Sequence, residues 1–177
     1  MKRLSSAVIA LSFSFLACYA FASDAKLISG AYELPKMKSI KPLTLPRLHL
    51  YDASGKLIDR AGWPQELSSL KATAGDAFCC ISDSPSPPGH QGPPPNCKKI
   101  VYGENRDEHF KGLFGKNHQP ITFGSIPKHK YLLVEYFADW CSPCIATRRE
   151  LEKFLSSSSG NGYVTLVIDF SGLAPSK

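Results

Sequence analysis

Two continuous apolar runs near the C-terminal end dominate the hydrophobic pattern of the chain. Residues 131–138 (YLLVEYFA) and 163–170 (YVTLVIDF) are short and rich in β-branched and aromatic residues, which is typical of buried strands. Between them, from residue 143, a stripe of positions recurs at spacings of four, three and four, which predicts a helix. The stripe consists of Cys144, Arg148, Leu151 and Leu155. This order of elements predicts a right-handed crossover between two parallel strands of one sheet.

A second, weaker pattern lies earlier in the chain. Apolar positions in residues 46–51 and 56–61, on either side of a turn at residues 52–55, predict a β-hairpin. Residues 64–73 follow with proline at the first position, which favours a short helix. Residues 23–43 carry only a weak pattern, so we expect no regular helix there.

Residues 75–97 form a Pro-, Gly- and Ser-rich stretch without apolar periodicity, which predicts a long loop. A disulfide from Cys79 or Cys80 to Cys97 would close this loop and stabilise the fold by roughly 3 kcal/mol. Two alternatives are a metal site that uses these cysteines with His90 and a second redox relay. Adjacent cysteines chelate zinc poorly, so we expect the structural disulfide.

The first residues are typical of a targeting segment. Residues 1–22 combine a short basic start, an apolar run and a small-x-small cleavage motif that ends at Ala22, which predicts a cleaved signal peptide. An uncleaved membrane anchor and a lipid attached to Cys18 are the alternatives. Each of the three places the remaining chain outside the cytosol, in the periplasm or in the secreted fraction, where disulfides persist.

Length and charge narrow the class of protein. The 177 residues suit one domain, which we divide into an N-terminal region, residues 23–130, and a β-α-β core, residues 131–177. The net charge is +6, but Lys and Arg are scattered along the chain. Nucleic-acid binding needs a clustered basic face, so we expect no nucleic-acid partner.

Candidate chemistry lies in the turn that joins the first buried strand to the predicted helix. Cys141 would lie at the helix N-terminus, where unpaired N–H groups and the helix dipole favour a reactive thiolate. Cys144, one turn further, can resolve a mixed disulfide formed at Cys141. Pro143 restricts the backbone between the two cysteines, and Trp140 can cover their sulfur atoms. A structural disulfide across so short a loop removes little chain entropy. A zinc site would need a second cysteine pair at matching spacing. We therefore expect a redox-active Cys141–Cys144 disulfide and no cofactor or metal.

The stretch LLVEYFADWCSPC, residues 132–144, resembles the active-site segment of the thioredoxin superfamily. The resemblance implies an α/β fold with a central β-sheet flanked by helices. It also implies that Cys141 is the nucleophile, that Cys144 resolves, and that Trp140 is the tryptophan of the motif. Glu135 takes the place of a buried aspartate that accepts and returns the proton of the second cysteine. The alternative for Glu135 is a glutamate that faces solvent.

The order of the structural elements along this chain differs from the order in the thioredoxin superfamily. Thioredoxins continue past the second strand through a helix, a cis-proline that faces the cysteines and binds substrate, a β-hairpin and a last helix, whereas this chain ends soon after residue 170. Residues 45–71 resemble the missing part. One hypothesis is a permuted fold in which Pro46 is the substrate-binding proline. The alternatives are an additional N-terminal hairpin and an incomplete, inactive copy.

These features predict an extracytoplasmic thiol–disulfide oxidoreductase of the secreted or membrane-tethered type, most simply a reductase in cell redox homeostasis. Its expected partners are protein thiols or disulfides and an upstream electron donor. It would contact a membrane only through an uncleaved leader or a lipid. The alternative from another class is a non-catalytic, disulfide-stapled binding protein. Peroxidase activity is less favoured, because Ala138 occupies the position where such enzymes carry threonine.

Overall fold

A computed structural model of the protein describes residues 26–40, 43–73, 79–81 and 106–173. The predicted signal peptide with Cys18, and His90 and Cys97 of the predicted loop, lie outside these residues. In the described part, no helix has the length and apolar character that a membrane span requires.

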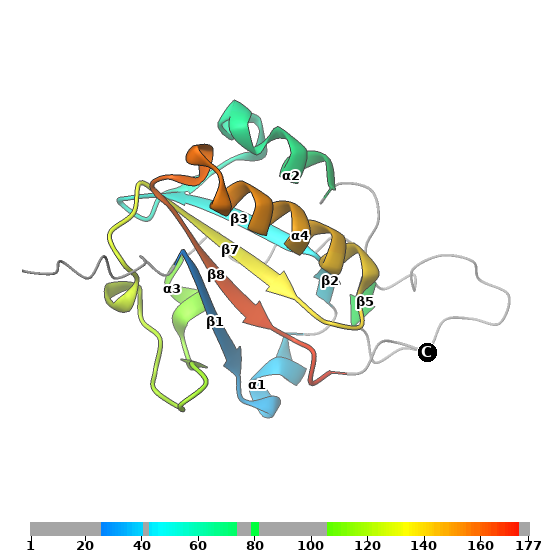
Figure 1. The fold of residues 1–177 in the computed structure, drawn as a ribbon. Coiled ribbons are helices and arrows are strands. Elements are labelled where there is room, and N and C mark those ends of the chain that lie inside the picture. Colours follow the sequence, from blue (N-terminus) through cyan, green and yellow to red (C-terminus); the bar gives the residue numbers. More distant parts are fainter. Residues whose placement is uncertain (1–25, 41–42, 74–78, 82–105, 174–177) are drawn as a thin grey trace, which may run out of the picture.

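A six-stranded sheet forms the centre of the fold, in the order β4-β3-β7-β8-β1-β6 (Figure 1). Strand β8 pairs in parallel with both β7 and β1. Strand β3 pairs antiparallel with β7 and with β4, and β6 pairs antiparallel with β1. The bounds are β1 Leu27–Tyr32, β3 Arg47–Asp52, β4 Leu57–Ile58, β6 Leu113–Phe114, β7 Tyr131–Phe137 and β8 Tyr163–Asp169.

A separate two-stranded sheet lies beside the end of β7. It joins β2, Leu43–Leu45, to β5, Cys79–Ile81, in antiparallel pairing. Its register places Leu45 opposite Cys79. This small sheet therefore brings a cysteine of the predicted loop region to the start of the hairpin region.

Within the described ranges, four α-helices surround the large sheet, together with short 3-10 turns. They are α1 Leu34–Ser39, α2 Ser68–Thr73, α3 Arg106–Phe110 and α4 Ser142–Ser156. The 3-10 turns are Arg60–Gly62, Gln65–Leu67, Phe123–Ser125 and Ser158–Gly160. Helices α2 and α4 lie together on one side of the sheet, whereas α1 and α3 lie on the other (Figure 1).

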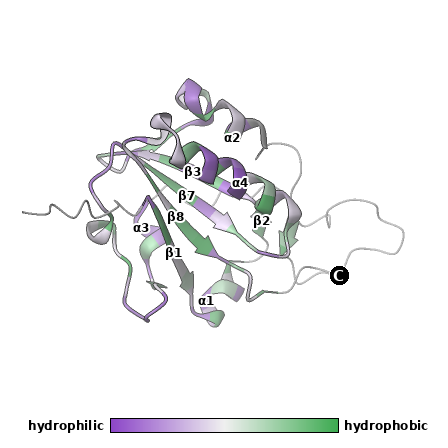
Figure 2. Cartoon of the chain, in the orientation of Figure 1, coloured by the Kyte–Doolittle hydropathy of each residue, from purple (hydrophilic) through white to green (hydrophobic). Residues whose placement is uncertain are grey.

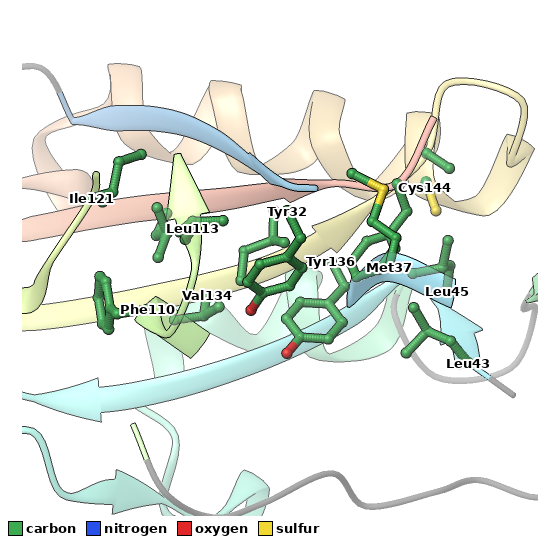
Figure 3. Close-up of a cluster of buried hydrophobic side chains, with 14 of the residues drawn as sticks. Tyr32, Met37, Leu43, Leu45, Phe110, Leu113, Ile121, Val134, Tyr136 and Cys144 are labelled. Carbon is green, nitrogen blue, oxygen red and sulfur yellow. The ribbon is translucent and has the colours of Figure 1, made fainter. Parts of the chain in front are cut away.

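Side chains of β7 alternate between two apolar clusters, one on each side of the sheet. Leu133 packs with residues of α2 and α4, whereas Leu132, Val134 and Tyr136 pack with residues of α1 and α3. Strands β7 and β8 are accordingly mostly hydrophobic, while the outer side of α4 is hydrophilic (Figure 2). Figure 3 shows the cluster on the α1 and α3 side. Burial on both sides explains why β7 and β8 read as continuous apolar runs.

The α/β class and the principal predicted elements are confirmed. The helix of the crossover is α4, the two buried strands are β7 and β8 in parallel, and the hairpin is formed by β3 and β4. Strand β1, in the weakly patterned region, was not expected. Helix α1 lies in the same region, where no regular helix was expected, and strand β5 lies in the stretch predicted to be a loop, so these two predictions were wrong. The N-terminal region and the β-α-β core both contribute strands to the same sheet.

Gly160, in the turn that follows α4, has no room for a side chain. A Cβ atom there would lie 2.5 Å from the Phe154 carbonyl oxygen and 2.7 Å from the Leu155 Cα atom. Both are backbone atoms, so relief requires the helix end to move. We expect Gly160→Ala to lower the free energy of unfolding by about 2 kcal/mol in urea denaturation. Gly172→Ala is the matched control, because no atom lies within 4 Å of the added Cβ. Equal losses in the two variants would contradict this prediction.

Candidate functional site

Cys141 lies at the N-cap of α4, directly after the turn that follows β7. Its backbone N–H donates a hydrogen bond to the Ala138 carbonyl at 3.2 Å, and its carbonyl accepts one from Ile145 at 3.1 Å. Pro143 occupies the first turn of the helix, where a missing N–H costs no helical hydrogen bond. The Cys141 sulfur therefore stands at the positive end of a helix of 15 residues.

The two motif residues that flank Cys141 in the sequence lie close to it. Cys144 is fully buried at the first turn of α4, and Trp140 is half-buried against the same apolar cluster. The cluster also contains Leu45, and Figure 3 shows Leu45 and Cys144 at the same end of it. The structure thus brings together Trp140, Cys141, Pro143 and Cys144, as the sequence suggested.

A segment distant in sequence completes the surroundings of Cys141. Its Sγ atom lies 3.7 Å from the carbonyl oxygen of Leu45, 96 residues away along the chain. The following peptide bond, Leu45–Pro46, is cis, and Pro46 is buried. Pro46 is therefore placed beside the cysteine motif rather than on a distant hairpin.

The disulfide pairing differs from the one we expected. Cys141 is bonded to Cys79, and Cys144 is a free, buried thiol. The expected Cys141–Cys144 bond is thus absent, and Cys79 is not the partner of Cys97. The reason is the pairing of β5 with β2, which sets Cys79 opposite the residue whose carbonyl contacts Cys141.

Cys80, the other half of the adjacent pair, is also disulfide-bonded. Among the other described cysteines, Cys79 and Cys141 are bonded to each other and Cys144 is free. A disulfide between Cys80 and Cys97 across the long loop stays a prediction.

Glu135 is buried in the middle of the sheet, so the solvent-facing alternative is wrong. Its side chain is 0% exposed. The Arg148 Nε atom donates a hydrogen bond to Glu135 Oε2 at 2.8 Å. Burial raises the pKa of Glu135 from 4.5 to about 7, although the charge of Arg148 and its hydrogen bond lower it. The second carboxyl oxygen, Oε1, has no hydrogen-bond partner among the described residues, so it is available for a proton.

Cys144 shares this environment. Burial, with a smaller contribution from the charge of Glu135, raises the pKa of its thiol to about 12, although a backbone hydrogen bond at Ala138 and the charge of Arg148 lower it. A thiol with so high a pKa stays protonated near neutral pH, so it needs a base in order to attack a disulfide. A carboxyl group with a pKa of about 7 can serve as that base.

Arg148 has a role that its place on the helical stripe with Cys144 does not reveal. A basic residue on a stripe that faces a buried strand is nevertheless a signal for a buried acidic partner. Its side chain is 15% exposed and pairs with Glu135 on β7. Arg148 thereby keeps the carboxyl group ionisable within an apolar surrounding.

A buried polar network on the α3 side of the sheet was also not predicted. The ring nitrogens of His109 form hydrogen bonds with the hydroxyl groups of Tyr51 and Tyr136, and the Tyr32 hydroxyl donates to the His109 carbonyl. Burial, followed by the charge of His49, lowers the pKa of His109 to about 3. His109 is therefore neutral near pH 7 and holds adjacent strands together.

Neither a metal site nor a similar known protein assigns a further function to these residues. In the described ranges, no group of three or more His, Cys, Asp or Glu side chains could hold a metal ion. Comparison of the chain with protein-family models, with curated proteins and with solved structures gave no match.

Proposed function

We propose that the protein is a thiol–disulfide oxidoreductase with a thioredoxin-like fold in permuted chain order. The observation that carries the proposal is the position of Cys141. Its sulfur stands at the N-terminus of α4, is already bonded to one cysteine, Cys79, and has a second, Cys144, one helical turn away. Such a position favours the thiolate and supplies both an attacking and a resolving thiol.

The chain order supports the permuted form of this fold. Pro46 lies beside Cys141, and the hairpin that follows it contributes β3 next to β7. Helix α2 then packs against α4. These are the relations expected if the part that follows the cis-proline in thioredoxins comes first in this chain.

The proposed reaction is reduction of a protein disulfide. A dithiol donor first reduces the Cys79–Cys141 bond and frees both thiols. The Cys141 thiolate then attacks one sulfur of the substrate, the substrate disulfide breaks, and one substrate thiolate leaves. Cys144 then transfers its proton to Glu135 and attacks the Cys141 sulfur. The second substrate thiolate leaves, and a Cys141–Cys144 disulfide forms. A dithiol donor returns two electrons to this disulfide and completes the cycle.

The proposed setting is extracytoplasmic, in the periplasm or the secreted fraction, as the leader-like residues 1–22 suggest. The substrates are proteins with accessible disulfides, and the upstream donor is a second thiol protein or a small thiol. A disulfide in the resting protein fits an oxidising compartment.

Reduction of insulin by dithiothreitol tests the proposed function. We expect the full-length protein at micromolar concentration to accelerate insulin precipitation well above the rate with dithiothreitol alone. The reason is that a positioned thiolate attacks disulfides faster than a free dithiol whose pKa is higher. An equal rate with and without the protein would contradict the proposal.

One observation favours a second candidate function. Cys141 is fully buried and bonded to Cys79, as in a permanent staple. In that case the protein is a non-catalytic, disulfide-stapled binding protein. Its Cys79–Cys141 bond would resist millimolar dithiothreitol in the folded state, whereas the redox function requires rapid reduction.

A further inference from the structure

Strand β5 approaches Cys141 in the way that an extended peptide would. Its three residues pair antiparallel with β2, with Ile81 opposite Leu43, Cys80 opposite Thr44 and Cys79 opposite Leu45. The two strands form a sheet of their own, separate from the central one. Backbone pairing of this kind is how many proteins hold an extended segment of a partner, with side chains seated in flanking pockets.

The pairing of β5 with β2 places the Cys79 sulfur next to the Cys141 sulfur. Leu45 ends β2, and its carbonyl oxygen lies 3.7 Å from Cys141 Sγ. Cys79, opposite Leu45, therefore meets Cys141, with the two Cα atoms 5.8 Å apart. Two residues further along β5, the Ile81 side chain is 1% exposed and anchors the strand in the apolar cluster.

We propose that residues 79–81 are an internal substrate segment, and that Cys79 is a third redox-active cysteine whose disulfide with Cys141 competes with protein substrates for the site. This inference rests on the proposed function, which it extends from two cysteines to three. It accounts for the observed bond between Cys79 and Cys141 and for the free thiol of Cys144.

Exchange among the three sulfurs is balanced without an external oxidant or reductant. The Cys144 thiol gives its proton to Glu135, and its thiolate attacks Cys141 Sγ. The Cys141–Cys144 bond forms, the Cys79–Cys141 bond breaks, and Cys79 leaves as a thiolate that takes a proton from water. The reverse attack by Cys79 restores the first form. The oxidised protein thus has two forms, which differ in the cysteine that carries the free thiol.

The environment of Cys144 sets the rate of exchange between these forms. Its thiol is buried and its pKa is raised, so near neutral pH it stays protonated and attacks the Cys79–Cys141 bond slowly. Because the Cys144 thiol resists ionisation, a rise in pH draws the equilibrium toward the form in which Cys144 is bonded. The groups that face it are Glu135 on β7 and Arg148 on α4. Since β5 has only three residues, few backbone hydrogen bonds hold it to β2.

Disulfide mapping of the full-length wild-type protein tests the inference directly. The protein is equilibrated in glutathione buffers, quenched in acid, alkylated and digested with trypsin. Cleavage after Lys and Arg leaves Cys79 in the peptide 72–98 and both motif cysteines in the peptide 131–148. Fragmentation of these peptides then identifies the alkylated cysteine.

We expect both oxidised forms. In one, the two peptides are joined and Cys144 is alkylated; in the other, the peptide 131–148 holds an internal disulfide and Cys79 is alkylated. The fraction of the second form should rise with pH. Alkylation of Cys79 in every oxidised molecule would overturn the inference. The inference would also be overturned if the two peptides stayed joined in every glutathione buffer and at every pH, because the Cys79–Cys141 bond would then be a permanent structural disulfide.

Substrate capture gives a second readout. In Cys144→Ser, Cys79 remains as the internal competitor, and a tethered thiol reaches effective concentrations on the order of millimolar. At a micromolar concentration of a peptide disulfide, we therefore expect Cys79→Ser/Cys144→Ser to form at least about tenfold more mixed disulfide than Cys144→Ser. Equal capture would overturn the inference. If the double variant does not fold, the mapping of wild type decides.

These results separate the inference from the function on which it rests. Insulin turnover by wild type, together with a Cys79–Cys141 bond that never exchanges with Cys144, would overturn the inference alone. Exchange among the three cysteines without insulin turnover, in wild type and in Cys79→Ser, would overturn the proposed function alone.

Discussion

Cys141→Ser is expected to lower the catalysed rate of disulfide reduction by about 1,000-fold or more, a loss typical of removing a nucleophile. Serine keeps the shape of the side chain and the start of α4, but its hydroxyl stays protonated at neutral pH and does not attack sulfur. The rate is measured with a small chromogenic disulfide by stopped flow and with insulin under turnover. A variant that keeps more than a tenth of the wild-type rate would show that another cysteine attacks.

Cys144→Ser is the matched control for this loss. It should keep the first attack on a small disulfide, because Cys141 and the N-terminus of α4 are unchanged, but it should turn over insulin much more slowly than wild type. The loss arises because Cys144 can no longer resolve the mixed disulfide, and only Cys79 remains to release the substrate. If both variants lost the first attack equally, the assignment of Cys141 as nucleophile and Cys144 as resolving thiol would be wrong.

Glu135→Gln is expected to remove about 3 kcal/mol from the pH-dependent part of the free energy of unfolding. This value follows from the difference between the pKa of about 7 in the folded protein and the ordinary pKa of 4.5. A carboxyl group whose pKa rises on folding stabilises the protein fully below its unfolded pKa. That stability is lost as pH rises through the folded pKa, because the unfolded chain ionises more easily. Wild type should therefore lose stability relative to Glu135→Gln as the pH rises from about 4 to about 8.

Urea denaturation of the oxidised proteins at each pH measures this difference. The comparison cancels the titration of buried histidines, which both proteins share. Glu152→Gln is the matched control: Glu152 lies on α4 and contributes to the pKa of Glu135, but it is itself exposed. It should change the pH profile by only a small amount. A flat difference between wild type and Glu135→Gln would mean that Glu135 keeps an ordinary pKa.

The β-α-β core could be predicted because its signals are local. Strands β7 and β8 are buried on both sides, so nearly every position is apolar, and the stripe of α4 follows one helical face. Cys141 and Cys144 lie between the apolar run of β7 and the stripe of α4, so their place in the sequence alone puts them at the junction of the two elements. Their positions at the start of the helix therefore followed from the sequence.

Strand β1 was missed because its composition reflects a tertiary contact. Its centre is Gly30, where an added Cβ would lie 2.8 Å from Ile121 Cδ1 and 3.1 Å from the Phe114 carbonyl oxygen. The segment that packs over β1 thus leaves no room for a side chain. Glycine lowers the strand propensity of the segment, although β8 and β6 hold it on both edges.

The cysteine pairing could not be predicted for a related reason. Cys79 and Cys141 are 62 residues apart, and nothing local links them. They meet only because β2 and β5 pair in one register and because Leu45 packs against the start of α4. Spacing in the sequence favoured the nearest partners, Cys144 for Cys141 and Cys97 for Cys79. The pairing in the structure instead follows from the placement of the strands.

The sheet order has a consequence for biosynthesis. Strand β8, between β7 and β1, is the last of the six to leave the ribosome, and β7 is the one before it. Strands β1 and β3 therefore lack their pairing partners β8 and β7 until most of the chain has emerged. Long-range pairing of this kind forms slowly, so we expect the nascent chain to need protection from aggregation during synthesis.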